Sequence, residues 1–208
     1  MQDTTIITRK NGRIYTVRSN RDRFFYPGEW LKFYNVLKSS QINTFDCLIS
    51  TGARINEIRH LKKEDVDFVN KRLILRVTKV KARKKEKNPR PRTIPFSTQF
   101  GRRLKSYFKD NTAEECSSIL STPAANIAMK NALQRAGIKD WYMFSIHNIR
   151  KSLETWMIAM NIDGLKITAH MGHSMGVAAG SYISADVFSP DERRQIRDII
   201  GDLYQVRF

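Results

Sequence analysis

One stretch of the chain, residues 71–92, constrains its fold more than any other. Its 22 residues hold eleven lysines and arginines and a single acid, Glu86. Residues 73–78 are apolar and β-branched and predict a strand, and residues 93–96 resume an extended pattern. The charged residues between them cannot be buried, and two prolines there favour turns. We therefore predict a β-hairpin with a long basic tip, and this density of cations favours contact with a nucleic-acid backbone over an ordinary solvated loop.

Outside this hairpin, apolar residues recur at helical spacing. Helices are predicted over residues 27–40, 42–49, 53–61, 97–109, 126–136, 147–160 and 165–171. A last helix should begin after Ser189, which can cap it, with Pro190 in its first position. The apolar stripe of this last helix must be buried on its own domain or on a neighbouring molecule. The predicted fold class is mainly α with a small antiparallel β-sheet, an α+β chain.

Composition narrows the function classes. The chain has 208 residues, 41% of them hydrophobic, and a net charge of +17. It can build a core, and its charge favours a polyanionic partner. No apolar run approaches the roughly 18 residues that cross a bilayer, and the basic stretch lacks the apolar residues of a membrane-surface helix. Cys47 and Cys116 form neither a metal pattern nor a disulfide framework. A reduced, cytoplasmic protein without a membrane partner is expected.

Three short segments place polar groups where a purely structural helix would not need them. Arg54 lies in the segment TGARINE, just after a glycine turn and at the start of an apolar helix, where a guanidinium and a helix N-terminus together favour phosphate. His147 and Arg150 are three residues apart and share a helix face. In the third segment, MGHS, His173 is followed nine residues later by Tyr182.

Taken together, these segments resemble the catalytic domain of the tyrosine recombinases, the phage integrases and Xer-type chromosome recombinases. That family has a TG-x-R-x-x-E segment, an H-x-x-R box, and L-G-H followed nine residues later by a tyrosine; here methionine replaces the leucine. The resemblance runs from about Phe24 to the C-terminus. A β-hairpin between the first two boxes carries a lysine in the family. Lys79 is its best match here, and Lys81, on the same face of an extended strand, is the alternative.

The resemblance implies a site-specific recombinase that cleaves and rejoins DNA without metal ions, ATP or any cofactor. Arg54, Arg150 and His173 would stabilise the charge that develops on the phosphate. Tyr182 would attack phosphorus and become joined to the 3′ side of the break. His170 and His173 have helical spacing, but neither cysteine nor carboxylate lies nearby to complete a metal site, so no metal is expected.

Proton transfer has its own expected residues. His147 would accept the proton of Tyr182, and Lys79 would protonate the departing 5′ oxygen. Glu57 is expected to orient Arg54. The cations of the hairpin expected to bind DNA are Lys81, Arg83, Lys84, Lys85, Lys87, Arg90 and Arg92.

The expected organisation is a basic arm or linker remnant over residues 1–22, the catalytic domain over 23–188, and a C-terminal helix over 189–208 available for exchange between subunits. The expected partners are double-stranded DNA and further copies of the chain, from dimer to tetramer. The setting would be integration or excision of a viral or mobile genome in a prokaryotic or virus-infected cell. The alternatives are relaxation of DNA by a type IB topoisomerase and binding of DNA by an inactive relative.

Most members of the family carry a helical core-binding domain before the catalytic domain. Only about 25 residues precede the first predicted helix of this chain. We therefore expect either a catalytic part of a longer protein or a minimal enzyme, with binding that depends strongly on salt.

Overall fold

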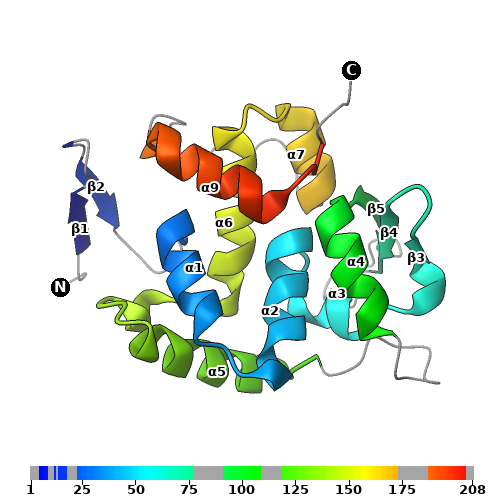
Figure 1. Ribbon diagram of the computed structural model, residues 1–208, viewed down its shortest axis with the longest axis horizontal. Helices are drawn as coiled ribbons and strands as arrows, with labels where there is room; N and C mark the ends of the chain where they lie inside the picture. The colour runs from blue at the N-terminus through cyan, green and yellow to red at the C-terminus, as the bar shows by residue number, and fades with distance from the viewer. Residues whose placement is uncertain are drawn as a thin grey trace, which may run out of the picture.

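Helices make up most of the described chain, and a small sheet lies at one side of them (Figure 1). The computed structural model describes residues 5–8, 12, 14–17, 23–76, 91–108, 119–172 and 187–204. The helices are α1 (Pro27–Asn35), α2 (Ser39–Thr51), α3 (Ile55–Arg59), α4 (Thr98–Tyr107), α5 (Thr122–Arg135), α6 (Ile146–Ala159), α7 (Gly164–Met171) and α9 (Pro190–Ile200), with short 3₁₀ turns at Lys63–Asp65 and Trp141–Met143. The predicted fold class is confirmed.

The sheet is antiparallel and has the order β3-β4-β5. Its strands are β3 (Val66–Asp67), β4 (Arg72–Leu75) and β5 (Arg92–Pro95). β4 and β5 are the two arms of the predicted hairpin, with Leu73 opposite Ile94. The basic tip between them lies outside the described residues. β3 was not predicted, because two residues are too short to show the alternation that identifies a strand.

A second pair of strands lies near the N-terminus. β1 (Thr5–Thr8) runs antiparallel to β2 (Ile14–Val17), and they form a separate two-stranded hairpin. Gly12, between them, has a φ of 79°, which is a backbone conformation that glycine adopts readily. Both strands lie within the segment expected to form an arm.

The helix ends follow the capping rules. Ser121 and Ser189 accept hydrogen bonds from backbone N–H groups in the first turns of α5 and α9. Each of these helices has a proline in its first turn, where the missing N–H costs nothing. α2 ends at Gly52, which has a φ of 58°. The sequence therefore predicted where α9 begins.

The part of the hydrophobic core that lies between α1, α2 and α6 is rich in aromatic rings. Phe25 packs against Phe33 and Phe144, with ring centroids 5.3 and 4.4 Å apart, and Trp30 meets Trp156 edge to face. α9 lies across α1 (Figure 1) and buries Ile196 completely. The apolar stripe of α9 is thus covered by its own domain. No helix within the described residues is long and apolar enough to span a membrane.

One charged side chain is buried at the beginning of this core. Arg23 is only 1% exposed, and its guanidinium forms ion pairs with Glu29, at 2.6 Å, and Asp140, at 2.7 Å. It also stacks on the ring of Phe144, 4.4 Å from the centroid. Because these partners lie far apart in the sequence, Arg23 ties the start of the domain to the turn before α6.

Candidate functional site

The site is built on the turn between α2 and α3. Gly52 takes a left-handed conformation there, and a Cβ atom at this position would lie 3.0 Å from Cε of Met171 and 3.1 Å from a methyl group of Leu153. The close approach presses the turn against α6 and α7. Directly after it, Arg54 stands at the N-cap of α3 with its side chain half exposed.

Arg150 reaches this turn from the second turn of α6. The residue is only 5% exposed, and its guanidinium donates to the carbonyl oxygen of Gly52, at 2.5 Å, and to that of Met171. Both acceptors are neutral. Burial, followed by the positive charges of Arg54 and Arg92, lowers the pKa of Arg150 to about 10. Arg150 is therefore a buried cation whose surroundings favour the arrival of an anion.

Glu57 lies beneath these arginines and is 2% exposed. It accepts hydrogen bonds from the backbone N–H of Arg54, at 2.8 Å, and from the guanidinium of Arg54, at 3.1 Å. Arg92 donates to both of its carboxylate oxygens, at 2.8 Å each. Burial would raise the pKa of Glu57, but the hydrogen bonds and charge of Arg92, followed by those of Arg54, hold it below its ordinary value. Glu57 thus contacts Arg54 as an ionised carboxylate.

Arg92 is placed differently from what the hairpin pattern indicated. We expected it to bind DNA together with the other hairpin cations, yet its side chain is only 11% exposed and paired with Glu57. Its Nε also donates to the carbonyl oxygen of His170, at 3.0 Å. The physical reason is that a buried carboxylate requires a partner cation, and β5 brings Arg92 within reach. Sequence reasoning missed this pair because its members are 35 positions apart.

His147 stands in the first turn of α6, and its side chain is exposed. Its position three residues before Arg150 puts the two on neighbouring parts of the helix surface.

The fold brings together four of the charged residues from three separate parts of the sequence: Arg54, Glu57, Arg92 and Arg150. The remaining predicted site residues lie outside the described part of the chain and stay predictions: Lys79, His173, Tyr182, Lys81, Arg83, Lys84, Lys85, Lys87 and Arg90.

His170 is a structural element of this region. It is 1% exposed, and burial lowers its pKa to about 3, so the ring is neutral at physiological pH. Its Nε2 lies 3.0 Å from the carbonyl oxygen of Thr51, which can only accept, so Nε2 carries the proton. Nδ1 then accepts from the hydroxyl of Tyr204, at 3.0 Å. The ring thereby links the site turn to the end of the described chain.

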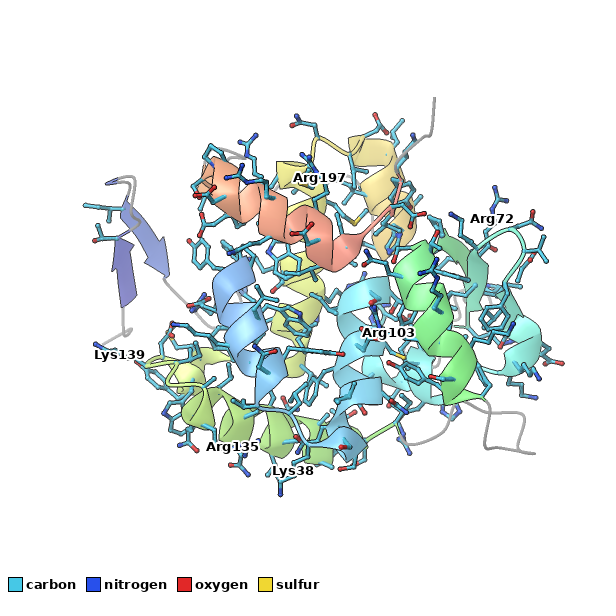
Figure 2. All side chains as sticks on the ribbon, viewed as in Figure 1. Lys38, Arg72, Arg103, Arg135, Lys139 and Arg197 are labelled. Atoms are coloured by element: carbon cyan, nitrogen blue, oxygen red, sulfur yellow. The ribbon has the colours of Figure 1, made fainter. Side chains whose placement is uncertain are left out.

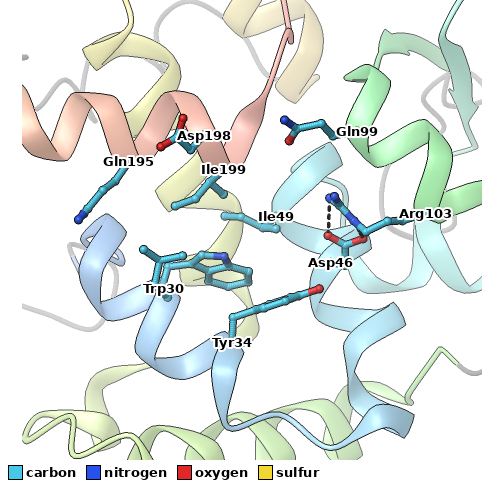
Figure 3. Close-up of a pocket in the computed structure, with 10 residues that line it drawn as sticks. Trp30, Tyr34, Asp46, Ile49, Gln99, Arg103, Gln195, Asp198 and Ile199 are labelled. Atoms are coloured by element: carbon cyan, nitrogen blue, oxygen red, sulfur yellow. Dashed lines mark hydrogen bonds and ion pairs between the residues drawn. The ribbon is translucent and has the colours of Figure 1, made fainter.

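Two further features of the structure bear on sites of other kinds. Among the described residues, no group of three or more His, Cys, Asp or Glu side chains is arranged to hold a metal ion. A cavity of about 330 Å³ lies between α1, α2, α4 and α9 (Figure 3), lined by residues that include Trp30, Tyr34 and the Asp46–Arg103 ion pair. None of the predicted site residues lines it. The cavity is thus separate from the cluster formed by Arg54, Arg92 and Arg150.

A family model described as the phage integrase family matches residues 24–187. No curated protein matches the chain. Several solved structures share its fold. The crystal structure of XerA recombinase is 16% identical, with a TM-score of 0.61, over 89% of this chain and 66% of that one.

Two structures determined with DNA are similarly related. The Tn1549 transposon integrase in complex with transposon right end DNA is 15% identical, with a TM-score of 0.59, over 85% of this chain and 65% of that one. XerH site-specific recombinase bound to difH substrate, in a pre-cleavage complex, is 15% identical, with a TM-score of 0.59, over 90% of this chain and 58% of that one. The chain thus spans about two thirds or less of the length of these proteins.

Proposed function

The chain belongs to the phage integrase family, and from this premise we propose that it cleaves and rejoins DNA strands through a covalent bond between Tyr182 and a 3′ phosphate. The observation that carries the proposal is Arg150. It is a buried guanidinium with two neutral carbonyl partners, and it lies close enough to Arg54 and Arg92 for their charges to lower its pKa. A phosphodiester is an anion that would relieve this excess of positive charge.

The proposed chemistry follows from where charge develops. Attack by an oxygen on phosphorus increases the negative charge on the non-bridging oxygens, and fixed guanidinium groups stabilise that charge without having to reorganise. Arg150 is held by Gly52 and Met171, and Arg54 is held by Glu57. Both arginines are therefore oriented before the substrate binds. Arginine also suits this task because its planar fork binds two phosphate oxygens and keeps its charge.

In the cleavage step, the phenolic oxygen of Tyr182 forms a bond to phosphorus while the bond to the 5′ oxygen breaks. His147 accepts the proton of the phenol, and Lys79, or Lys81 in its place, gives a proton to the 5′ oxygen. His173 adds a hydrogen bond to the phosphate. The phosphotyrosyl bond conserves the energy of the broken phosphodiester. Religation is the reverse reaction and consumes no ATP.

We also propose double-stranded DNA as the partner and several copies of the chain on it, from two to four. Basic side chains support this proposal beyond the hairpin. Lys38, Arg135 and Lys139 lie along the α5 side of the molecule, whereas Arg197 lies on α9 (Figure 2). We propose that such copies exchange their C-terminal helices. The reaction would integrate or excise a mobile or viral genome in the cytoplasm.

The test uses a pool of short duplexes with a randomised centre and a nick in one strand, so that the cleaved fragment diffuses away. We expect the wild-type chain to form a covalent adduct that survives denaturing gel electrophoresis, and sequencing of the adducts gives the preferred duplex. Tyr182→Phe should abolish the adduct and retain DNA binding. Tyr142→Phe is the matched control, because Tyr142 is an exposed tyrosine (51%) outside the predicted boxes.

The outcomes separate the alternatives. An adduct that persists in Tyr182→Phe shows that another residue is the nucleophile. Binding without any adduct indicates an inactive DNA-binding protein. An adduct accompanied by relaxation of supercoiled DNA, but not by joined duplexes, favours a topoisomerase.

A further inference from the structure

Two arginines compete for one buried carboxylate in the site. Arg92 donates through both terminal nitrogens to the two oxygens of Glu57, each at 2.8 Å. The guanidinium of Arg54 makes a single contact with the same carboxylate, at 3.1 Å. The side chain of Arg92 is 11% exposed, whereas that of Arg54 is 50% exposed. The better ion pair therefore belongs to Arg92, and half of the Arg54 side chain is exposed to solvent.

A carboxylate that is 2% exposed forms its strongest interaction with a guanidinium that uses two parallel hydrogen bonds. Only one arginine can hold both oxygens of Glu57 in this way. If Arg92 were absent, the buried carboxylate would have Arg54 as its remaining contact, and a bidentate pair between them would turn the guanidinium inward. The unbalanced negative charge would also repel an incoming phosphate.

We propose that Arg92 is a positioning residue that occupies Glu57, limits the guanidinium of Arg54 to its single contact with that carboxylate, and thereby leaves the rest of the guanidinium available to a DNA phosphate. The part of this proposal that concerns binding of a DNA phosphate rests on the proposed function. The competition between the two arginines for Glu57 does not, and it can be tested separately.

Arg92 is held in this role by contacts other than Glu57. Its Nε donates to the carbonyl oxygen of His170 in the last turn of α7, at 3.0 Å. Its aliphatic part lies against Gly172, where a Cβ atom would lie 2.9 Å from Cδ of Arg92. Gly172 also has a φ of 65°, which glycine tolerates best. Strand β5 and the end of α7 thus fix the side chain together, so Glu57 meets an arginine that is already oriented.

The first experiment is a crystal structure of Arg92→Met in the full chain. Methionine keeps the unbranched aliphatic part of the side chain and removes the charge. We expect two nitrogens of Arg54 to bind both oxygens of Glu57, with Arg54 less exposed than in the wild type. An Arg54 that keeps a single contact with Glu57 would overturn the proposal.

The second experiment measures the rate of adduct formation in a single turnover on the duplex preferred by the wild-type chain. Arg92→Met should slow this step by about 10- to 100-fold, the usual size of a lost supporting contact, and change the dissociation constant for DNA by less than about threefold. Arg92→Lys, which keeps the charge but loses the fork, should be slowed less.

The decisive variant is the double substitution Arg92→Met with Glu57→Gln. Glutamine carries no charge, so it should hold Arg54 less firmly, and the double variant should be faster than Arg92→Met alone. A double variant slowed by the product of the two single effects would show that Arg92 does not act through Glu57.

Arg76→Met is the matched control. Arg76 donates to the buried carboxylate of Asp65, at 3.0 Å, beside the other strand of the same hairpin. Its loss removes a comparable ion pair and should leave the rate nearly unchanged; an equal slowing would mean that any damage to the sheet has this effect. If the wild-type chain forms no adduct, the proposed function fails, and the orientation of Arg54 in the crystal structure still decides the role of Arg92.

Discussion

Replacing Arg150 by methionine should cost the folded protein much less than the same replacement of Arg23, although both side chains are buried. Arg23 is balanced by two carboxylates, Glu29 and Asp140. Arg150 binds two neutral carbonyl oxygens instead, those of Gly52 and Met171. Arg23→Met leaves two acids without this cation, whereas Arg150→Met removes a charge that its surroundings already disfavour.

The magnitude for Arg150 follows from its pKa. Burial, followed by the charges of neighbouring arginines, lowers this pKa from 12.5 to about 10, which at about 1.4 kcal/mol per pH unit corresponds to roughly 3 kcal/mol of unfavourable free energy in the folded state. Losing two hydrogen bonds from a charged donor costs about 1.5 to 3 kcal/mol each. The first effect offsets much of the second, and we expect Arg150→Met to lower the free energy of unfolding by no more than about 3 kcal/mol.

Arg23→Met should lower the free energy of unfolding by about 3 to 5 kcal/mol, as the loss of one partner from a buried ion pair does. Urea unfolding at neutral pH measures both variants. The same titration with added inorganic phosphate should stabilise the wild type and leave Arg150→Met unchanged, because the anion interacts with a cation whose hydrogen-bond partners among the described residues are neutral carbonyl groups. An Arg150→Met variant as unstable as Arg23→Met would show that the charge of Arg150 is well compensated in the folded protein, contrary to this expectation.

Three further outcomes are expected. Gly52→Ala should destabilise the fold by about 1 to 3 kcal/mol more than Gly137→Ala, measured by urea unfolding, because both glycines have positive φ but only the first would clash with neighbours; equal losses would contradict this. Between about pH 6.5 and pH 3, stability should fall by up to roughly 4 kcal/mol because the unfolded chain protonates His170 first. His170→Gln should remove that part of the pH slope in unfolding experiments, and an unchanged slope would exclude the mechanism. Asp202→Asn should cost about 1 kcal/mol at pH 7 by thermal unfolding, since Asp202 accepts from the backbone N–H of Thr98 at the start of α4. Partial burial would raise the pKa of Asp202, but hydrogen bonds lower it to about 2, so the stabilisation is present above pH 4 and the cost of the variant should vanish as the pH falls towards 2.

The sequence alone predicted the elements whose signals are local. Apolar periodicity indicated the helices, and Ser189 with Pro190 marked the start of α9. The strands β4 and β5 were indicated by β-branched residues on each side of the basic stretch. α5 begins four residues earlier than predicted, at Thr122, because Ser121 caps a first turn that contains few bulky apolar residues.

The spacing of the boxes also selected the candidate site residues. Arg54, His147 and Arg150 were selected because three motifs stand in the order and at the distances that the resemblance requires. Such spacing is visible without coordinates, since it depends only on positions along one chain. It gives no indication, however, of which charges are buried or of which acid balances which cation.

Only the tertiary structure decided those pairings. Arg92 forms an ion pair with the buried Glu57 and is itself mostly buried, unlike the exposed DNA-binding cation that the hairpin pattern indicated. Arg23 is buried and pairs with two acids, Glu29 and Asp140. The apolar stripe of α9 packs on its own domain. Each of these depends on groups far apart in the sequence, and no local pattern records their distance in space. The physical reason is that the free energy of a charge depends on what surrounds it, and those surroundings exist only once the helices and the sheet have packed.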